Sequence, residues 1–509
     1  MLTHWRFMNS RSKSSFYHDS ASYTENLKVF EKLEGHRGCV NTVAWDKSGT
    51  KILSGGDDAI LRIHQFLSDW DKPWVKDHVY EISLPNSRNI LSAKFMPIYN
   101  NQIVSASKCG SIFLVDVNST NKELNVFYKH SGPTLNIATF EDEAFNFATA
   151  SNDKTFCIFD IRESNNIPFL KMNLPCSLSA IAIHPLCSYK IAIGGSDSCV
   201  RVFDKRYLNK SFNNVEKTLK YVTEICRPLQ FPIDNKISNR SPLYNYGRRC
   251  VNSVSFEPRL GNHILVSYMY DSIYLFDTRQ QENRQSDFQP ERLPLDTSSF
   301  RIHYNWENTG PPRPEGEQER GDIICPPSIQ SFLDDLQLNE SSYESKIDFT
   351  IESQLKSVKR YKEVQIYVGH QNCRTMIKDS KFWGTKYILS GSECGHILVW
   401  EKDSKYPIMA IPTDERVTNR IEPHPFLPII ATCGIDYNVK IVGSTLQPIK
   451  SPEEKQAYVE KIVNQNERRT ENAKGCQSMS MLDLLRVIRA QRMINRINSG
   501  ISGSDININ

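Results

Sequence analysis

The chain has 509 residues, 39% of them hydrophobic and 24% charged, so it can bury a large core. A formal net charge of only +4 gives little drive for direct nucleic-acid binding, which we do not expect. No apolar run approaches the roughly 18 residues of a membrane helix, so we expect no membrane contact. The 13 scattered cysteines, without a signal segment, predict reduced thiols and a location in the nucleus and/or cytoplasm.

The N-terminal residues 1–24 are expected to form a tail with a short helix. Leu2, Trp5 and Met8 recur at helical spacing, but nine residues are too few to hold a helix alone. We therefore expect this helix to form only when the protein docks on a partner, where it would add to the contact.

From residue 25 onward the sequence repeats one plan of short alternating strands and tight turns. "LEGHRGCVNTVAWDKSGTKILSGGDDAILRIHQF" (33–66) holds a Gly-His pair, alternating strand segments and polar turns between them. "YVGHQNCRTMIKDSKFWGTKYILSGSECGHILVWEK" (367–402) follows the same order. Aligned on their strand endings, the copies lie at about 36–66, 78–118, 130–163, 176–208, 250–280, 370–402 and 418–443.

This plan resembles the WD40 repeat, in which each copy forms one four-stranded blade of a propeller. The resemblance implies an all-β fold, a seven-bladed WD40 β-propeller over residues 25–443 with loop insertions and a C-terminal helix. A single sheet cannot bury both of its faces, so the blades must stack around a ring. The last copy stops after three strands, so we expect residues 25–36 to supply its outer strand and close the ring.

Segments outside the copies are expected to be loops, a linker and one helix. The insertions are 209–249 and 281–360, the second of which is rich in Pro, Gly and charge. A polar linker (444–477) precedes a predicted helix (478–500) and a tail (501–509). The apolar side of this helix could pack on the propeller or an adaptor. Its arginines could instead suit a calmodulin-like or acidic partner.

Polar residues repeated in register are interpreted as structural. His36, Ser54 and Asp58 could suggest a hydrolase triad, but His and Ser recur in register in another copy, which one active site would not require. In WD40 blades such groups form a buried hydrogen-bond network. The residues assigned to it are His36, Ser54, Asp58, Asp153, Asp197, His370, Ser390, Trp400 and Asp436. No nucleophile motif, phosphate-binding loop or metal-ligand spacing occurs, so we expect no catalytic residue, cofactor or metal.

Three copies end on the same acid and base, written Phe-Asp-x-Arg. The pairs are Asp160 and Arg162, Asp204 and Arg206, and Asp277 and Arg279. The Arg is not needed to build a blade, because copies two, six and seven lack it. Strand alternation predicts that the three arginines point outward at one face of the ring, unless each folds back onto its own Asp. A guanidinium there would offer five donors to a partner's carboxylates and carbonyls.

The third copy carries further resemblance. "TAS" (149–151), Asp153, Phe156, Ile158 and the Asp-x-Arg ending are similar to the box with which WD40 substrate receptors of cullin-4 ubiquitin ligases dock the damaged-DNA-binding adaptor protein. "GHRGCVNTVAW", "AIGGSDSCVRVFDKR" and "HPFLPIIATCGIDYNVKI" resemble the nuclear receptor interaction protein type of this family. A calmodulin-binding segment of such relatives is not expected here, because 281–360 lacks an I-Q-x-x-x-R-G pattern.

This resemblance implies a non-catalytic receptor. Its three Asp-x-Arg pairs would dock the adaptor and the cullin-4 ligase, and another surface would present an unidentified client protein for ubiquitination. Two alternatives stand beside it. A ubiquitin-independent WD40 scaffold of a nuclear or transcription-related complex would bind through its top surface and insertions and would not use the boxes. An enzyme would need residues converging in the central channel.

Overall fold

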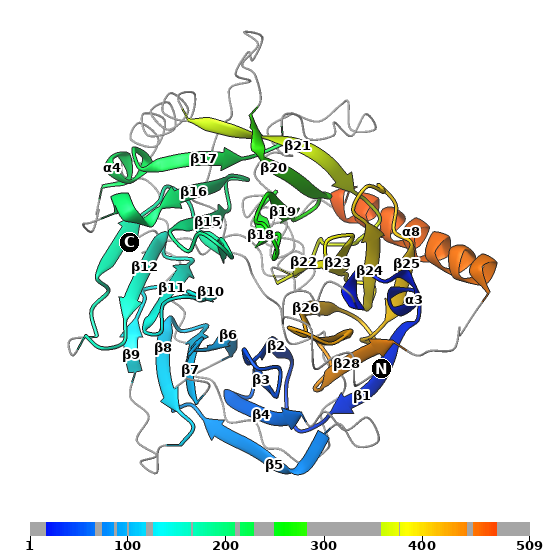
Figure 1. Cartoon of the computed structure of the whole chain (residues 1–509), viewed down its shortest axis with the longest axis horizontal. Helices are drawn as coiled ribbons and strands as arrows, with labels where there is room; N and C mark the ends of the chain where they lie inside the picture. Colours follow the sequence, from blue (N-terminus) through cyan, green and yellow to red (C-terminus); the bar gives the residue numbers. More distant parts are fainter. Residues whose placement is uncertain are drawn as a thin grey trace, which may run out of the picture.

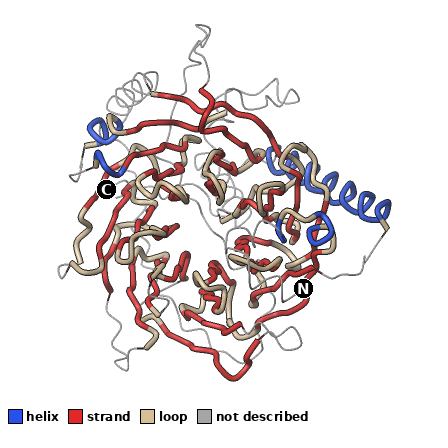
Figure 2. The backbone as a smooth tube through the Cα atoms, viewed as in Figure 1, coloured by secondary structure: helices blue, strands red, loops and turns tan. Residues whose placement is uncertain are grey.

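The structure, a computed structural model, describes residues 17–66, 74–85, 89–98, 101–118, 126–163, 166–208, 214–228, 249–281, 358–375, 377–444 and 451–475. The described strands form seven four-stranded blades around a common centre (Figure 1). Strands make up nearly the whole ring, and the helices lie at its rim (Figure 2). The predicted all-β, seven-bladed propeller is confirmed.

Blades are numbered in chain order, and the strands of each are given from the innermost to the outermost. Blade 1 comprises β2 (Val40–Trp45), β3 (Lys51–Gly56), β4 (Ile60–Phe66) and β5 (Trp74–Ser83). Blade 2 comprises β6 (Ile90–Phe95), β7 (Gln102–Ser107), β8 (Ser111–Asp116) and β9 (Val126–Lys129). Blade 3 comprises β10 (Thr134–Thr139), β11 (Asn146–Ser151), β12 (Thr155–Asp160) and β13 (Leu170–Asn173).

Blade 4 comprises β14 (Leu178–Ile183), β15 (Lys190–Gly195), β16 (Val200–Asp204) and β17 (Val222–Cys226). Blade 5 comprises β18 (Val251–Phe256), β19 (His263–Tyr268), β20 (Ile273–Gln281) and β21 (Lys359–Tyr367). Blade 6 comprises β22 (Ser380–Trp383), β23 (Tyr387–Gly391), β24 (His396–Glu401) and β25 (Met409–Pro412). Blade 7 comprises β26 (Thr418–Pro423), β27 (Ile429–Gly434), β28 (Val439–Ser444) and β1 (Leu27–Leu33). The described helices are α3 (Ala21–Thr24), the 3-10 helix η1 (Lys205–Tyr207), α4 (Val215–Leu219) and α8 (Pro452–Gly475).

The ring closes between the two ends of the propeller. β1 pairs antiparallel with β28, with Leu27 opposite Ser444 and Leu33 opposite Val439. An N-terminal strand therefore completes the last blade, and the expectation that residues 25–36 supply its outer strand is confirmed. The pairing hides the outer edge that β28 would otherwise expose.

Blades 4 and 5 are joined at the rim. β17 pairs in parallel with β21, with Glu224 opposite Lys359 and Ile225 opposite Arg360, so the two blades form one eight-stranded sheet. Treating all of 209–249 as an insertion was therefore wrong. This segment contains α4 and β17, because blade 4 needs a fourth strand to cover β16. Most of both insertions lies outside the described residues.

The segment predicted as a linker contains the long helix α8, which corrects the sequence interpretation. Ser451 and Glu454 form a capping box, in which each backbone N–H donates to the other side chain at 3.1 and 3.2 Å. Val459, Ile462 and Val463 form a narrow apolar stripe that packs on blades 5 and 6. This stripe was not recognised in the sequence because the rest of the helix is polar. The predicted helix 478–500 and the N-terminal residues 1–16 lie outside the described residues.

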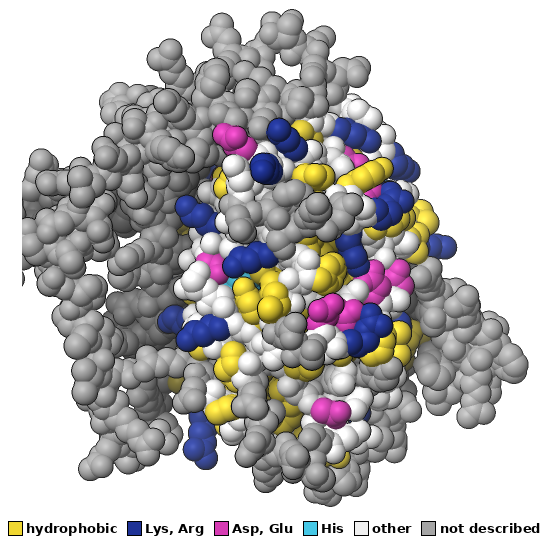
Figure 3. Space-filling view, turned by 90° about the vertical axis from the view of Figure 1, so that its left-hand side faces the viewer, with side chains coloured by type: hydrophobic (Ala, Val, Ile, Leu, Met, Phe, Trp, Pro, Cys, Tyr) yellow, Lys and Arg dark blue, Asp and Glu magenta, His cyan; other side chains and the backbone are white. Residues whose placement is uncertain are grey.

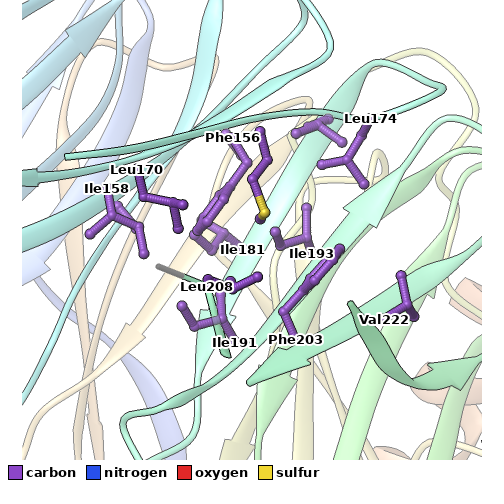
Figure 4. Packing of buried hydrophobic residues seen from close by; sticks show 14 of the residues in the cluster. Phe156, Ile158, Leu170, Leu174, Ile181, Ile191, Ile193, Phe203, Leu208 and Val222 are labelled. Carbon is purple, nitrogen blue, oxygen red and sulfur yellow. The ribbon is translucent and has the colours of Figure 1, made fainter. Parts of the chain in front are cut away.

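Apolar side chains fill the interfaces between blades. Figure 4 shows the cluster between blades 3 and 4, where Phe156 of blade 3 lies beside Ile181 of blade 4. Hydroxyl groups on inner strands also join neighbours. Thr42 Oγ1 accepts the N–H of Ala93 at 3.1 Å. Ser92 Oγ and Ser253 Oγ likewise each accept a backbone N–H from the first strand of the next blade. The ring is thus held by both apolar packing and paired polar groups.

The loops lie on two faces, because every blade has the same strand order. Loops that join the first strand to the second and the third to the fourth lie on one face. We call it the box face, since Arg162 and Arg206 follow the third strands of their blades and Arg279 lies near the end of another third strand. Loops that join the second strand to the third, or one blade to the next, lie on the opposite face, which we call the far face.

Candidate partner-docking site

The three Asp-x-Arg boxes form the same turn on three consecutive blades. Asp160, Asp204 and Asp277 face the first residue of the second strand of their blade. The next residue of each box then donates its N–H to the carbonyl just before that strand. These bonds join Ile161 to Phe145 at 3.0 Å, Lys205 to Tyr189 at 2.7 Å, and Thr278 to Asn262 at 2.8 Å. The boxes therefore occupy equivalent positions on the box face.

Each arginine folds back onto its own aspartate and yet stays exposed. Nη2 lies 2.5, 2.6 and 2.9 Å from Oδ2 of the partner carboxylate in Arg162, Arg206 and Arg279. The arginine side chains are 62%, 59% and 59% exposed, and the carboxylates only 16%, 9% and 3%. Nε and one Nη2 proton face the carboxylate, which leaves the Nη1 protons and the other Nη2 proton for a partner. Each arginine therefore points outward, as predicted, and at the same time folds back onto its own aspartate.

The carboxylates fix the direction of these side chains. In each box the backbone N–H of the Arg also donates to Oδ1 of the Asp, at 2.9–3.0 Å. Hydrogen bonds from the Arg lower the pKa of Asp160, Asp204 and Asp277, for Asp277 to about 2. Each carboxylate is therefore ionised at neutral pH and holds the planar guanidinium in one orientation.

Aromatic rings support two of the three guanidinium groups. Cζ of Arg162 lies 4.5 Å from the ring centroid of Phe145, and Cζ of Arg206 lies 3.6 Å from that of Tyr189. In blade 5 the equivalent position is Asn262, so no such ring supports Arg279 among the described residues. Phe145 and Tyr189 were not predicted from the sequence. The strand register could have found them, because each precedes the second strand of its blade.

Side-chain bridges link blades 3 and 4 at this site. Lys205, the middle residue of the second box, contacts both carboxylate oxygens of Glu143 in blade 3 at 2.5 Å. Ser188 donates to Asp142 of the same blade 3 loop at 2.6 Å. Arg162 and Arg206 are therefore carried on two loops whose relative position is fixed.

The structural network predicted from sequence forms in several blades with different partners. In blade 1, Nδ1 of His36 lies 2.9 Å from Asp58 Oδ2, and Nε2 lies 2.8 Å from Ser54 Oγ. In blade 3, His130, which the sequence interpretation missed, contacts Asp153 at 3.1 Å and Thr149 at 3.0 Å. "KHSGP" (129–133) precedes this blade in the place of the first Gly-His pair, which could have identified it.

Blades 4 and 7 use a buried cation in place of histidine. Asp197 binds Arg201, whose Nη2 lies 2.5 Å from Oδ2. Asp436 binds the fully buried Lys440 at 2.6 Å, and Asp414 contacts the same ammonium group. Both aspartates were predicted from their turns, and the cations four residues later were not.

In blade 6 the predicted pairing of His370 with Ser390 does not occur. Ser390 Oγ donates to the carbonyls of Asp379 and Gly391, and neither ring nitrogen of His370 has a hydrogen-bond partner in the described part of the chain. Cys394 stands where blades 1, 3, 4 and 7 have the turn Asp, so His370 lacks an acidic partner at this position. Burial lowers the pKa of His370 to about 4, so the ring is neutral. Trp400 is fully buried, and its Nε1 donates to Val368 at 3.0 Å.

Helix α8 adds other polar contacts to blade 6. It runs along the outside of the blade from the box face, where Lys455 contacts the carbonyl of Glu25 (Figure 1). At the far face, Asn466 Nδ2 donates to the carbonyl of Gly369 at 2.9 Å and lies 3.3 Å from Cys394 Sγ. The helix is thus part of the propeller.

The segment that precedes β1 is fixed to the box face at blades 6 and 7. The ring of His18 stacks on Trp383 at 4.0 Å, and its Nε2 lies 2.7 Å from the carbonyl of Leu427. Asp19 accepts hydrogen bonds from the backbone and the hydroxyl of Thr385. Gly384 has a φ of +65°, and a Cβ there would lie 2.2 Å from the Asp19 carboxylate, so only glycine suits this position.

Side chains fill the centre of the ring at the level of Arg420. Its Nη1 lies 2.8 Å from Asp379 Oδ1, and its Nε donates to the carbonyl of Asn41 at 3.2 Å. Leu91, Leu135 and Ile377 form an apolar cluster from blades 2, 3 and 6. Among the described residues, no group of His, Cys, Asp and Glu side chains is arranged to hold a metal ion, and no helix is long and apolar enough to cross a membrane.

Comparison with known proteins agrees with this architecture. The family model "WD domain, G-beta repeat" matches residues 27–65. DDB1- and CUL4-associated factor 6 of Homo sapiens is 31% identical over 60% of this chain and 35% of its own length. WD repeat protein iqw1 of Schizosaccharomyces pombe is 28% identical over 55% of this chain and 36% of its own. WD and tetratricopeptide repeats protein 1 of Homo sapiens is 20% identical over 86% of this chain and 88% of its own.

The chain spans about a third of the length of the first two of these relatives. Together with the ring of blades, the comparisons show that the chain carries a WD40 repeat and folds as a WD40 β-propeller. It is similar to a family of cullin-4-associated WD40 proteins.

Proposed function

We propose that this chain is a substrate receptor of a cullin-4 ubiquitin ligase and docks the damaged-DNA-binding adaptor protein with its box face. The observation that carries the proposal is the arrangement of Arg162 and Arg206. The two side chains lie on adjacent blades in the same orientation, each held by its own carboxylate and an aromatic ring. Fixed side chains lose little conformational freedom on binding, which favours a specific contact.

Arg279 extends the same site to a third blade. Its ion pair with Asp277 matches the other two, but no aromatic ring in the described part of the chain supports the guanidinium, so its position is less constrained. We therefore assign it a smaller share of the docking contact. The name of the human relative associates that protein with DDB1 and CUL4, which agrees with this assignment of partners.

The N-terminal segment would add to the same contact. His18 and Asp19 hold the chain against blades 6 and 7 on the box face. The described part of this segment is therefore held on the face that carries the arginines, which supports a role for residues 1–16 in the same contact. Their predicted helix would fold on the adaptor, and deleting residues 1–12 should weaken adaptor binding.

The proposed receptor takes no part in the chemistry of ubiquitin transfer, which would occur on other subunits of the ligase. A client protein would bind away from the box face, in the nucleus and/or cytoplasm. The filled centre of the ring gives no support to an enzyme in the central channel, since Arg420 is already paired with Asp379 there.

Affinity capture with mass spectrometry tests this function. The full chain should recover the adaptor and cullin-4, and the variant Arg162→Ala with Arg206→Ala should lose both. The matched control is Asn118→Ala in blade 2, where an Asp-Val-Asn turn has the same backbone bond, from the Asn118 N–H to Asp116 Oδ1 at 2.9 Å, but no guanidinium. Circular dichroism melts should show that all three proteins are folded, because exposed ion pairs contribute little to stability.

Two outcomes would argue against the proposal. If the wild-type chain recovers neither protein, or if the folded double variant recovers them equally well, the boxes are ordinary blade endings. The ubiquitin-independent WD40 scaffold would then account better for the propeller.

A further inference from the structure

We propose that the far face binds an acidic protein segment through exposed cations on its loops. This inference deepens the proposed function, on which it rests in assigning the far face to the client. The cations, which we call the basic arc, are Arg37, Lys108, Lys129, Lys154 and Arg374. They are exposed side chains, and no ion pair joins any of them to a carboxylate in the described part of the chain.

The basic arc covers consecutive blades of the ring. Arg374 lies in the loop that enters blade 6, and Arg37 in the loop that joins blade 7 to blade 1. Lys108 and Lys154 lie in the second-to-third-strand turns of blades 2 and 3, and Lys129 ends β9 on the same face. The described far-face loops of blades 4 and 5 expose no lysine or arginine. Among the described residues, the exposed positive charge of this face is therefore concentrated on the loops of blade 6 and of blades 1 to 3.

Most carboxylates of these loops are already engaged. Asp58 is bound by His36, and Asp153 by His130. Asp57 accepts from the side-chain amides of Asn41 at 2.7 Å and Asn89 at 2.8 Å. These turn aspartates therefore stabilise their own blades, and the neighbouring cations are available to bind a ligand.

Two carboxylates on the same described loops are exposed, and they limit the kind of ligand that fits. Glu34 accepts a hydrogen bond from Asn438 at 3.2 Å, and Glu415 follows the buried Asp414. They divide the positive charge into separate points. Such points suit carboxylates or phosphates spaced along a peptide, whereas a nucleic-acid backbone needs a continuous positive track.

The charge pattern of the basic arc differs from that of the rim of the propeller. The side of the molecule shown in Figure 3 carries cations with carboxylates and apolar groups interspersed among them. On the box face each proposed docking arginine has its own carboxylate. The basic arc therefore differs from the adaptor site in that, in the described part of the chain, its cations form no ion pair with a carboxylate.

Fluorescence anisotropy on the full chain tests the inference. The probes are a labelled 12-residue peptide of alternating Glu and Gly, the same peptide with phosphoserine for Glu, and a 12-nucleotide uridine RNA. We expect both peptides to bind, and we expect their affinity to fall as the salt concentration is raised. The peptide that binds more tightly shows whether carboxylate or phosphate is the better ligand. The arc variant, Lys108→Glu with Lys154→Glu and Arg374→Glu, should bind at least about tenfold more weakly.

A matched control separates the site from net charge. Lys28→Glu with Lys32→Glu and Lys461→Glu makes the same change in charge at exposed positions on β1 and α8. It should bind within about twofold of wild type once salt is at a physiological level. Equal losses in the two triple variants, no peptide binding by the wild type, or tighter binding of the RNA than of either peptide would overturn the inference.

Adaptor capture on the arc variant keeps the two proposals distinguishable. The arc variant should still recover the adaptor, and the Arg162→Ala, Arg206→Ala variant should still bind the peptides. Loss of both activities in one folded variant would contradict the assignment of two separate faces.

Discussion

Replacing Ile462 of α8 with alanine should destabilise the whole propeller. Ile462 is only 6% exposed and packs with Tyr367 and Trp400 in the core shared by blades 5 and 6. Truncating a buried isoleucine removes its transfer free energy and leaves a cavity, which together cost about 2–4 kcal/mol. The free energy of unfolding should fall by this amount, although the residue lies outside the repeats.

Guanidinium denaturation followed by tryptophan fluorescence measures this loss, since Trp400 lies in the same cluster. The control is Lys461→Ala, the preceding exposed residue, which should change the free energy of unfolding by less than about 0.5 kcal/mol. Asn466→Ala should cost about 1–3 kcal/mol, because it leaves the Gly369 carbonyl without its donor. If Ile462→Ala and Lys461→Ala unfold at the same denaturant concentration, α8 does not pack on blade 6 and the reasoning fails.

Asp58→Ala should lower the free energy of unfolding by about 2 kcal/mol, measured by the same denaturation, because the buried His36 loses its partner; an unchanged midpoint would contradict the network. Acidification should also destabilise the fold, because burial lowers the pKa of His18 and His370 to about 4, below the unfolded value of 6.5. The folded rings stay neutral while the unfolded chain binds protons, so stability falls as pH drops from about 6.5 to 4, by up to about 2 kcal/mol per ring at pH 5. Urea midpoints that stay constant from pH 7 to 5 would argue against it. Asp19→Ala should speed proteolysis near α3, since it frees the N-terminal segment from blade 6; equal cleavage rates would contradict this clamp.

The blades and their order could be predicted from sequence because the relevant signals are local. Alternating strands such as "VNTVAW" and polar turns such as "GGDDA" specify each unit within about 30 residues. Closure by β1 followed from the missing strand of the last copy. The box arginines could be assigned to one face, because a third strand always ends there.

Other features depend on contacts between distant residues and could not be predicted in this way. The stripe of α8 is short, and its docking surface includes Tyr367 and Trp400, far away in the sequence. Phe145 supports Arg162 through the register of two strands, which the box motif does not contain. His370 matches the repeat pattern, yet Cys394 removes its acidic partner. A repeated motif thus predicts a position in the blade, and the neighbouring residues determine which bonds form there.

Calorimetric titration of the purified adaptor into the purified full chain tests the central claim most directly. The account predicts saturable binding to the wild type and binding at least about tenfold weaker for Arg162→Ala with Arg206→Ala, since fixed, exposed arginines at the centre of a contact are frequent hot spots. Asn118→Ala should bind as the wild type does. No binding by the wild-type chain, or equal binding by the folded double variant, would contradict the assignment of the box face as the adaptor site.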